Sequence, residues 1–374
     1  MNIGPVVRKE FRQIRRDKRA LGILIFIPAV LLILVGYALN FDVKHLRLAV
    51  YDEDNTRTSR EFVNSFVHSE YFEYKYHALS KRELDEVLND GTAHLALVIP
   101  RDFSQNLLSG RQATVQVILD GSNNNTASVA SGYVAAGVQD YSRKILTEWL
   151  EKRGRSLVVP IGVRPKLWYN PELKTAKYLV PGLFGLILMI VTVISTSLSV
   201  VREKELGTME QLKTSPLKSY EIIIGKAIPY VVIALISATL IMVLGALLFD
   251  VRIQGSIPLL YLAILIFVLG GLGQGLLISS IANSQQVAFF LSVFSSLLPS
   301  FLLSGFIFPI KSMPLVLQAV SNLQATKFFL VIVRSIILKG VGVGAFWEQF
   351  VYLFLFAALT IGVSSVRLQR ELSR

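Results

Sequence analysis

The chain is built from long apolar blocks separated by polar segments, with one extended stretch of mixed sequence near its start. An α-helix needs about 20 residues to cross a hydrocarbon core about 30 Å thick. Six blocks reach that length, at residues 20–40, 177–201, 221–249, 257–281, 287–308 and 346–366. The pattern predicts an all-α membrane domain of six transmembrane helices.

Residues 41–176 have the periodicity and turn residues of a water-exposed domain. Runs typical of strands occupy residues 46–51, 73–77, 94–99 and 113–119, and patterns typical of helices occupy 59–68, a segment from 80, 103–108 and 123–153. Strands that alternate with helices in this way predict a compact α/β domain. Because the domain is inserted between spans 1 and 2, it is extracytoplasmic if the N-terminus is cytoplasmic.

Residues 309–345 contain a further apolar run, at 328–338, that is tempting as a seventh span. Lys327, Arg334 and Lys339 argue against a span, because a charge at the centre of a bilayer helix costs roughly 2.5–3.5 kcal/mol on insertion scales. We therefore expect an outer re-entrant or interfacial helical pair in this region.

Composition and charge agree with a membrane protein. Apolar residues make up 52% of the 374 residues and charged residues 17%, and the formal net charge is +12, whereas soluble domains carry roughly 25% charged residues. The densest positive run, Arg8 to Arg19, abuts the first apolar block. Cytoplasmic loops are enriched in Lys and Arg, so this placement predicts two cytoplasmic termini rather than a nucleic-acid surface.

Within residues 1–19 the apolar side chains recur at helical spacing. Ile3, Val7, Phe11 and Ile14 fall near one face and arginines crowd the rest, which predicts a cytoplasmic amphipathic helix in the headgroup plane.

Several chemistries are excluded by the sequence. It contains no cysteine and no G-x-x-x-x-G-K-[ST] phosphate-binding loop. The four histidines lack metal-ligand spacing. We therefore expect no catalytic residue, no metal and no bound cofactor in this chain, and no nucleotide hydrolysis by it. Four glycines inside span 4, Gly270, Gly271, Gly273 and Gly275, are interpreted as sites of close helix packing.

The loop after span 2, residues 202–220, has the most informative local pattern. Arg202, Glu203, Lys204 and Glu205 alternate in sign, and Gly207-Thr208 is typical of one helix ending and another beginning. The segment is either a solvated turn or a short helix presented to a partner, and charge patterning alone does not choose between them.

This loop, Arg202-Glu-Lys-Glu-Leu-Gly-Thr-Met-Glu-Gln-Leu with Ser215-Pro216 and Gly225-Lys226, resembles the hallmark of the ABC type-2 permease family. Four further segments resemble the same family in order and spacing: Arg8-Lys-Glu10, Tyr169-Asn-Pro-Glu172, Ser304-Gly-Phe-Ile-Phe-Pro309 and Arg334-Ser-Ile-Ile-Leu-Lys-Gly340. The resemblance covers essentially the whole chain, and the nearest subgroup is the bacterial drug-type exporters with a large outer domain. Gln324-Ala-Thr-Lys327 departs from the family pattern, which often has a proline before the threonine.

The resemblance implies a type V exporter-like permease of the bacterial inner membrane. It implies a dimer with a second, identical or homologous permease, a separate ABC ATPase that binds ATP and Mg, and in some cases a periplasmic adaptor. The implied ATPase-coupling residues are Glu10, Arg202, Glu203, Glu205, Gly207, Thr208 and Glu210. The implied outer gate is Ser304, Gly305, Phe306 and Pro309, and by position Phe289, Phe290 and Phe294 are candidates to line the pathway or to face lipid.

Spans without central ionisable residues favour a hydrophobic or amphipathic, drug-like or lipid-like cargo over an ion-coupled carrier. An alternative function is a membrane-anchored receptor or assembly factor whose outer domain binds a ligand. The exporter interpretation expects Glu203→Lys or Glu205→Lys to leave the protein folded but to uncouple the ATPase.

Overall fold

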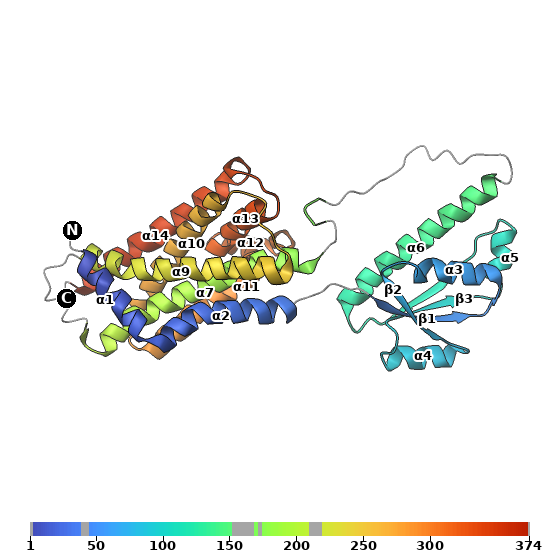
Figure 1. Ribbon diagram of the computed structural model, residues 1–374, viewed down its shortest axis with the longest axis horizontal. Coiled ribbons are helices and arrows are strands. Elements are labelled where there is room, and N and C mark those ends of the chain that lie inside the picture. The colour runs from blue at the N-terminus through green and yellow to red at the C-terminus, as the bar shows by residue number, and fades with distance from the viewer. Residues whose placement is uncertain (1–2, 39–44, 152–167, 171–173, 209–218, 373–374) are drawn as a thin grey trace. The chain divides into compact units, whose positions relative to one another are not determined.

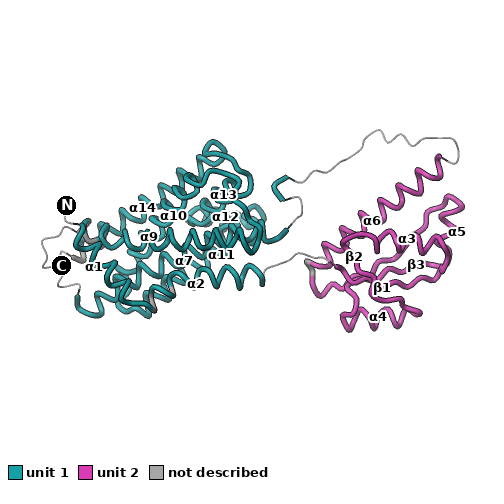
Figure 2. Tube along the Cα trace, in the orientation of Figure 1, with its two compact units in different colours: residues 1–40, 167–374 teal, residues 41–166 magenta. Residues whose placement is uncertain are grey.

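The computed structural model describes residues 3–38, 45–151, 168–170, 174–208 and 219–372 (Figure 1). The chain divides into two compact units, one of residues 1–40 with 167–374 and one of residues 41–166 (Figure 2). The insert was predicted at 41–176, and residues 41–166 group together in the second unit.

The first unit is helical. Its elements are α1 (Ile3–Arg16), α2 (Lys18–Ala38), α7 (Thr175–Glu205), α9 (Ser219–Phe249), α10 (Ile257–Ser279), α11 (Gln285–Leu303), η1 (Ile310–Ser312), α12 (Leu315–Ser321), α13 (Ala325–Ile337), η2 (Val343–Ala345) and α14 (Trp347–Leu372). Within the described residues five helices, α7, α9, α10, α11 and α14, are long and apolar enough to cross a membrane. These five correspond to predicted spans 2 to 6, and α2 covers predicted span 1 with an apolar stretch at Leu24–Ala38.

The glycines of α10 pack against the helices on either side of it, as predicted. At Gly271 an added Cβ would lie 3.1 Å from Thr192 of α7, and at Gly273 it would lie 2.5 Å from Thr360 of α14. Only a residue without a side chain allows backbones to approach so closely. The glycines thus place α10 tightly between α7 and α14.

Two features at one end of this unit differ from the expected boundaries or refine them. Predicted span 5 continues to residue 308, but α11 ends at Leu303, because Gly305 has a φ of +77° that a right-handed helix cannot continue through. The segment 309–345 contains the expected pair of helices: α12 and α13 meet at an angle of 78°. Ten of the 13 residues of α13 are buried, so this short helix is a core element.

The second unit is an α/β fold. Its elements are β1 (Leu46–Asp52), α3 (Arg57–Val67), β2 (Phe72–His77), α4 (Lys81–Asn89), β3 (Leu95–Ile99), α5 (Phe103–Leu108), β4 (Gln116–Leu119) and α6 (Asn124–Glu151). The strand order is β2-β1-β3-β4; β1 is parallel to β2 and β3, and β4 is antiparallel to β3. Helices α3, α5 and α6 cover one face and α4 the other. Each predicted strand and helix is present, with ends within about three residues of the prediction.

Candidate functional site

The predicted amphipathic helix at the N-terminus forms α1, and a face other than the predicted apolar one packs on the neighbouring helices. Val6, Glu10 and Ile14 face the interior. Val6 lies against Gly225 of α9, where an added Cβ would come within 2.7 Å of it. Of the four apolar residues predicted to share one face, Ile14 is buried, Ile3 and Val7 are half-buried and Phe11 is exposed, so their placement in the headgroup plane stays a prediction. The apolar pattern could not reveal the face that packs on the other helices, because one of its residues is a carboxylate.

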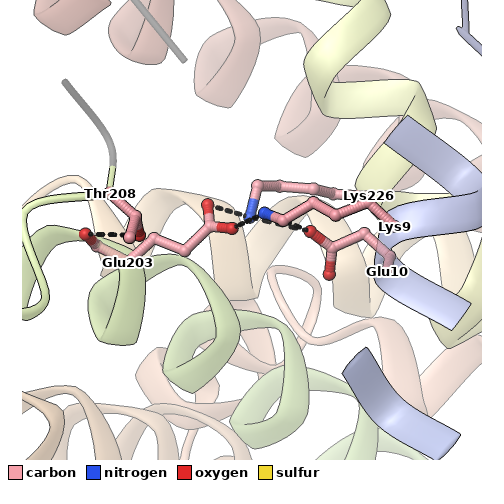
Figure 3. A network of polar contacts seen from close by, with 5 residues as sticks. All are labelled: Lys9, Glu10, Glu203, Thr208 and Lys226. Carbon is pink, nitrogen blue, oxygen red and sulfur yellow. Dashed lines mark hydrogen bonds and ion pairs between the residues drawn. The ribbon is translucent and has the colours of Figure 1, made fainter. Parts of the chain in front are cut away.

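Two carboxylates and two lysines meet where α1, α7 and α9 come together (Figure 3). Glu203 of α7 forms ion pairs with both Lys9 of α1 and Lys226 of α9. A carboxylate oxygen of Glu10 lies 3.4 Å from the ammonium of Lys226 and 3.4 Å from that of Lys9. Glu10, Glu203 and Lys226 are only 1%, 3% and 3% exposed. We call these four residues the ionic cluster.

The formal charges of the ionic cluster cancel. Taking an ion out of water costs several kcal/mol, which is repaid only when opposite charges and hydrogen bonds surround it. Each buried carboxylate here has two ammonium partners. Burial alone would lower the pKa of Lys9. The hydrogen bonds that Lys9 donates to Glu203 and Glu10, and the negative charges of these two residues, outweigh burial and raise that pKa above its ordinary value of 10.5. Lys9 therefore keeps its charge at neutral pH.

Consecutive charged residues at the C-terminal end of α7 contact different parts of the helical unit. Arg202 donates a 3.1 Å hydrogen bond to Asp17, between α1 and α2. Glu203 belongs to the ionic cluster. Lys204 donates a 2.6 Å hydrogen bond to the carbonyl of Ser279, at the last turn of α10, where a cation also interacts favourably with the helix dipole.

Glu205 completes this set by holding the start of α11. Its carboxylate accepts a 2.7 Å hydrogen bond from the backbone N–H of Gln285 and a second bond from the side-chain amide of the same residue. Ser284 caps the same helix by accepting from the N–H of Val287. A negative charge at a helix N-terminus is stabilising. The charged run 202–205 is therefore the point where α7 is connected to α1, α9, α10 and α11, and neither of the two interpretations from charge patterning describes it fully.

These contacts change what can be expected of the ATPase-coupling residues. Glu10 and Glu203 have almost no exposed surface, so any part they take in coupling acts through helix positions. Glu203→Lys would place a third lysine beside Lys9 and Lys226, so the expectation that this variant stays folded no longer holds. Glu205→Lys would remove the bond to α11.

The surface at this end of α7 is formed by Arg202 and Glu205 together with the residues just after the helix. Leu206 is 65% exposed, and Gly207 turns the chain with a φ of +70°. The Thr208 hydroxyl donates to the carbonyl of Glu203 at 3.3 Å. Glu210 and the helix expected after Thr208 lie outside the described residues.

The four predicted gate residues lie together at the C-terminal end of α11. Ser304 is 2% exposed and donates a hydrogen bond to a carbonyl one turn earlier, and Gly305 ends the helix. The ring of Phe306 is fully buried against Gly182 of α7. Pro309 precedes the 3₁₀ turn η1. Ser304 and Phe306 are thus packed into a corner between α7 and α11, whereas Pro309 is exposed.

The three phenylalanines considered for the pathway lie on the exposed side of α11. Phe289, Phe290 and Phe294 are 44%, 51% and 60% exposed. The opposite side of this helix is buried and small, formed by Ala288, Ser292, Ser296 and Ser300. Both interpretations, pathway and lipid, require exposure from the chain, so the assignment stays a prediction.

Several residues that the structure places at these sites were not among the predicted site residues. Lys226 and Lys9 complete the ionic cluster, Gln285 donates two hydrogen bonds to Glu205, and Arg334 contacts the gate. Lys226 and Arg334 had a usable signal, because a charged residue within an apolar block is costly and is retained for a function by default. Within the described residues, no group of three or more His, Asp or Glu side chains could hold a metal ion.

Comparisons with known proteins agree with the geometry. Residues 18–366 match the family described as ABC-2 family transporter protein. The chain is 33% identical over 98% of both lengths to the probable multidrug ABC transporter permease YbhR of Escherichia coli K12. It is 32% identical to the probable multidrug ABC transporter permease YbhS, over 97% of this chain and 96% of that one. It is 25% identical to the inner membrane transport permease YhhJ, over 99% and 98%.

Proposed function

This chain belongs to the ABC-2 family of transporter proteins, and from that membership we propose that it is the permease subunit of an ABC exporter driven by a separate ATPase subunit. Two relatives of nearly the same length are named as multidrug ABC transporter permeases. The sequence contains no phosphate-binding loop, so ATP and Mg belong on the partner subunit. We assign the complex to the bacterial inner membrane, as in the name of the YhhJ relative.

The observation that carries the coupling mechanism is the charged run 202–205. A push on the end of α7 reaches α1 and α9 through Glu203, α10 through Lys204 and α11 through Glu205. Buried ion pairs and helix-end hydrogen bonds have fixed geometry, so they transmit displacement better than a solvated turn does. We infer that the ATPase moves several helices at once by acting on this one segment.

The surface beside this run fits a docking partner. Leu206 offers an exposed apolar side chain at the end of α7. A shallow cleft next to it is lined by Arg12, Arg16 and Arg202, with Asp17 as its one acid. We propose that Leu206 inserts into the ATPase and that the arginines face acidic side chains of that subunit.

The order of the helices along the helical unit supports a transporter with a cytoplasmic end and an outer end. In the helical unit, α1 and the last turns of α14 lie at one end, while α12 and α13 lie toward the other (Figure 1). With the basic end cytoplasmic, the corner at Ser304–Pro309 is the outer gate and the α/β unit is extracytoplasmic. We propose an amphipathic or hydrophobic cargo and a second permease across the exposed face of α11, with an adaptor as a further partner.

A direct test compares two acidic residues in the complex with its ATPase, reconstituted in lipid nanodiscs. Glu205→Ala removes both hydrogen bonds that join the end of α7 to Gln285 at the start of α11. We expect permease-stimulated ATP hydrolysis to fall severalfold, because displacement of α7 is then no longer passed to α11 at this point. Glu348→Gln, an exposed acid in the first turn of α14, is the matched control and should leave the rate unchanged.

The receptor alternative makes a different prediction for the same material. A receptor or assembly factor would not copurify with a P-loop ATPase. If such an ATPase were added to the protein, neither variant would change the rate at which that ATPase hydrolyses ATP. Equal ATPase rates for Glu205→Ala and Glu348→Gln would remove the coupling role of the charged run. Absence of any stimulated hydrolysis in the unmodified complex would remove the exporter function itself.

A further inference from the structure

Arg334 lies near the end of the buried helix α13 and makes contacts with two other helices. Its guanidinium donates to the carbonyl of Gly305 at 3.1 Å and to those of Phe306 and Tyr178 at 3.4 Å. The guanidinium carbon also lies 3.9 Å from the centre of the Tyr178 ring. Tyr178 in turn donates its hydroxyl to the carbonyl of Gly305 at 3.3 Å. One arginine thus joins α13, the first turn of α7 and the end of α11.

The partners of Arg334 are unusual for a partly buried cation. No carboxylate among the described residues forms an ion pair with it, and its charge is met by three carbonyls and an aromatic face. Carbonyls at a helix C-terminus carry partial negative charge, and Gly305 in its left-handed conformation ends α11 there. Arg334 therefore holds the turn that follows α11 from a neighbouring helix. A planar guanidinium can reach three such oxygens at once, which an ammonium cannot.

The same contacts hold the buried Phe306 ring in place. An added Cβ at Gly182 of α7 would lie 2.3 Å from that ring, so the aromatic side chain fills the notch left by the glycine. Phe301 meets Phe306 edge to face, with ring centres 6.0 Å apart. If Arg334 releases the two carbonyls, the hydrogen bond from the Tyr178 hydroxyl to Gly305 is the polar contact that still joins this turn to α7.

The two ends of α11 are held alike. At its N-terminus Glu205 binds Gln285, and at its C-terminus Arg334 binds Gly305 and Phe306. Between them, hydroxyls line the side that faces its neighbours: Ser292 contacts Ser197 of α7 at 2.6 Å, and Ser300 contacts Thr326 of α13 at 2.8 Å. Small hydroxyl residues re-pair easily when helices shift, so the fixed points of α11 are its charged ends.

We propose that Arg334 and Tyr178 form a latch that holds the outer ends of α7, α11 and α13 together, and that cargo leaves only after the latch releases Gly305 and Phe306. The proposal rests on the proposed function for the direction of export, but the latch itself is a property of this chain alone. Because carbonyls and a ring replace a carboxylate, the latch is weak enough to open reversibly. Arg334 is a positioning residue: it holds the gate residues Gly305 and Phe306 in place through their carbonyls.

The chain contains no cysteine, so single introduced thiols report which sites open. Ser304→Cys places a thiol at a position that is 2% exposed in the gate. In nanodiscs without nucleotide or ATPase, we expect a membrane-impermeant maleimide to label it slowly when Arg334 is present. Labelling should become at least several-fold faster with Arg334→Gln, and Arg334→Lys should be intermediate. Tyr178→Leu should accelerate it more than Tyr178→Phe, which keeps the ring.

Two control thiols separate gating from unfolding. Ser279→Cys, fully buried on α10, should stay unlabelled in every Arg334 variant, and Lys311→Cys, exposed next to the gate, should label rapidly in all. Equal rates at position 304 with and without Arg334 would overturn the latch. Simultaneous labelling at 279 and 304 would also overturn it, because Arg334 would then support the whole bundle. Because no ATPase is present in this assay, the labelling result does not depend on whether the protein exports cargo. A failed latch would likewise leave the proposed export function untouched.

Discussion

Removing one cation from the ionic cluster should destabilise the helical unit more than any exposed charge substitution. Lys226→Met leaves Glu10 and Glu203 buried with Lys9 as their only cation, so the cluster changes from neutral to a net charge of −1. Methionine fits the aliphatic part of lysine, so the variant removes charge with little change in volume.

The size of the effect follows from the distances. The Lys226 ammonium lies 3.4 Å from a Glu10 oxygen, which corresponds to about 5 kcal/mol at an effective dielectric constant of about 20. Part of this attraction is offset by the desolvation that the lost ammonium no longer suffers. Breaking a buried pair by removing one partner costs about 3–5 kcal/mol in proteins, and we expect a loss of free energy of unfolding in that range.

The assay is equilibrium unfolding in mixed micelles, followed by the loss of helical circular dichroism. Lys311→Met is the control, because Lys311 is exposed and surface substitutions usually stay within about 0.5 kcal/mol. A second variant, Lys226→Met with Glu203→Met, removes one charge of each sign and leaves Glu10 with Lys9. This double variant should regain most of the stability lost in Lys226→Met.

Either of two results would refute the buried ion pairs as the source of this stability. One is a free energy of unfolding of Lys226→Met within about 1 kcal/mol of that of Lys311→Met, a difference too small for a broken buried ion pair. Alternatively, the double variant could be less stable than Lys226→Met alone, which would show that Glu203 contributes independently of the buried charge balance.

Two further predictions concern packing and pH. Gly275→Ala should lower the free energy of unfolding by about 1–3 kcal/mol, as overpacking does, because the added Cβ would lie 2.7 Å from the carbonyl of Val193. Gly362→Ala is the control and should leave the free energy of unfolding unchanged, because its Cβ meets nothing within 4 Å. Equal effects of the two substitutions would contradict the packing argument. In the α/β unit, burial and the nearby Arg47 charge lower the pKa of His94 below its ordinary 6.5. The unfolded chain then binds more protons than the folded one, so the free energy of unfolding should fall as the pH drops below about 6.5. Urea unfolding at pH 7.5 and 5.5 measures this loss, and His94→Gln should make it smaller. An equal loss in His94→Gln would assign the pH dependence to other groups.

Much of the architecture could be predicted because it depends on local or one-dimensional patterns. Apolar block length identified the five long helices, since each must bury its own backbone bonds in lipid. The strands and helices of residues 45–151 followed from alternation and turn residues, down to the short helix Phe103–Leu108. The glycines of α10 were correctly assigned to packing, because a missing side chain has few other uses inside a span.

The charged residues were harder to interpret, because their meaning depends on what lies opposite them. Glu10 and Glu203 were expected at a docking surface, and nothing in the sequence pairs them with Lys226, which is 23 residues beyond Glu203 and 216 beyond Glu10. The face of α1 that packs on the other helices was not predicted for the same reason, since a carboxylate counts as polar until its cation is known.

The sequence by itself determined which helices are long and apolar enough to cross a membrane, that an α/β unit is inserted between α2 and α7, and that the run 202–205 is a distinctive site. Only the tertiary structure decided that this run connects α7 to four other helices, and that Arg334 reaches the gate turn from α13. Helix formation is a property of neighbouring residues. Ion pairs and helix caps join residues that are distant in sequence, and only the packing of the helices brings them together.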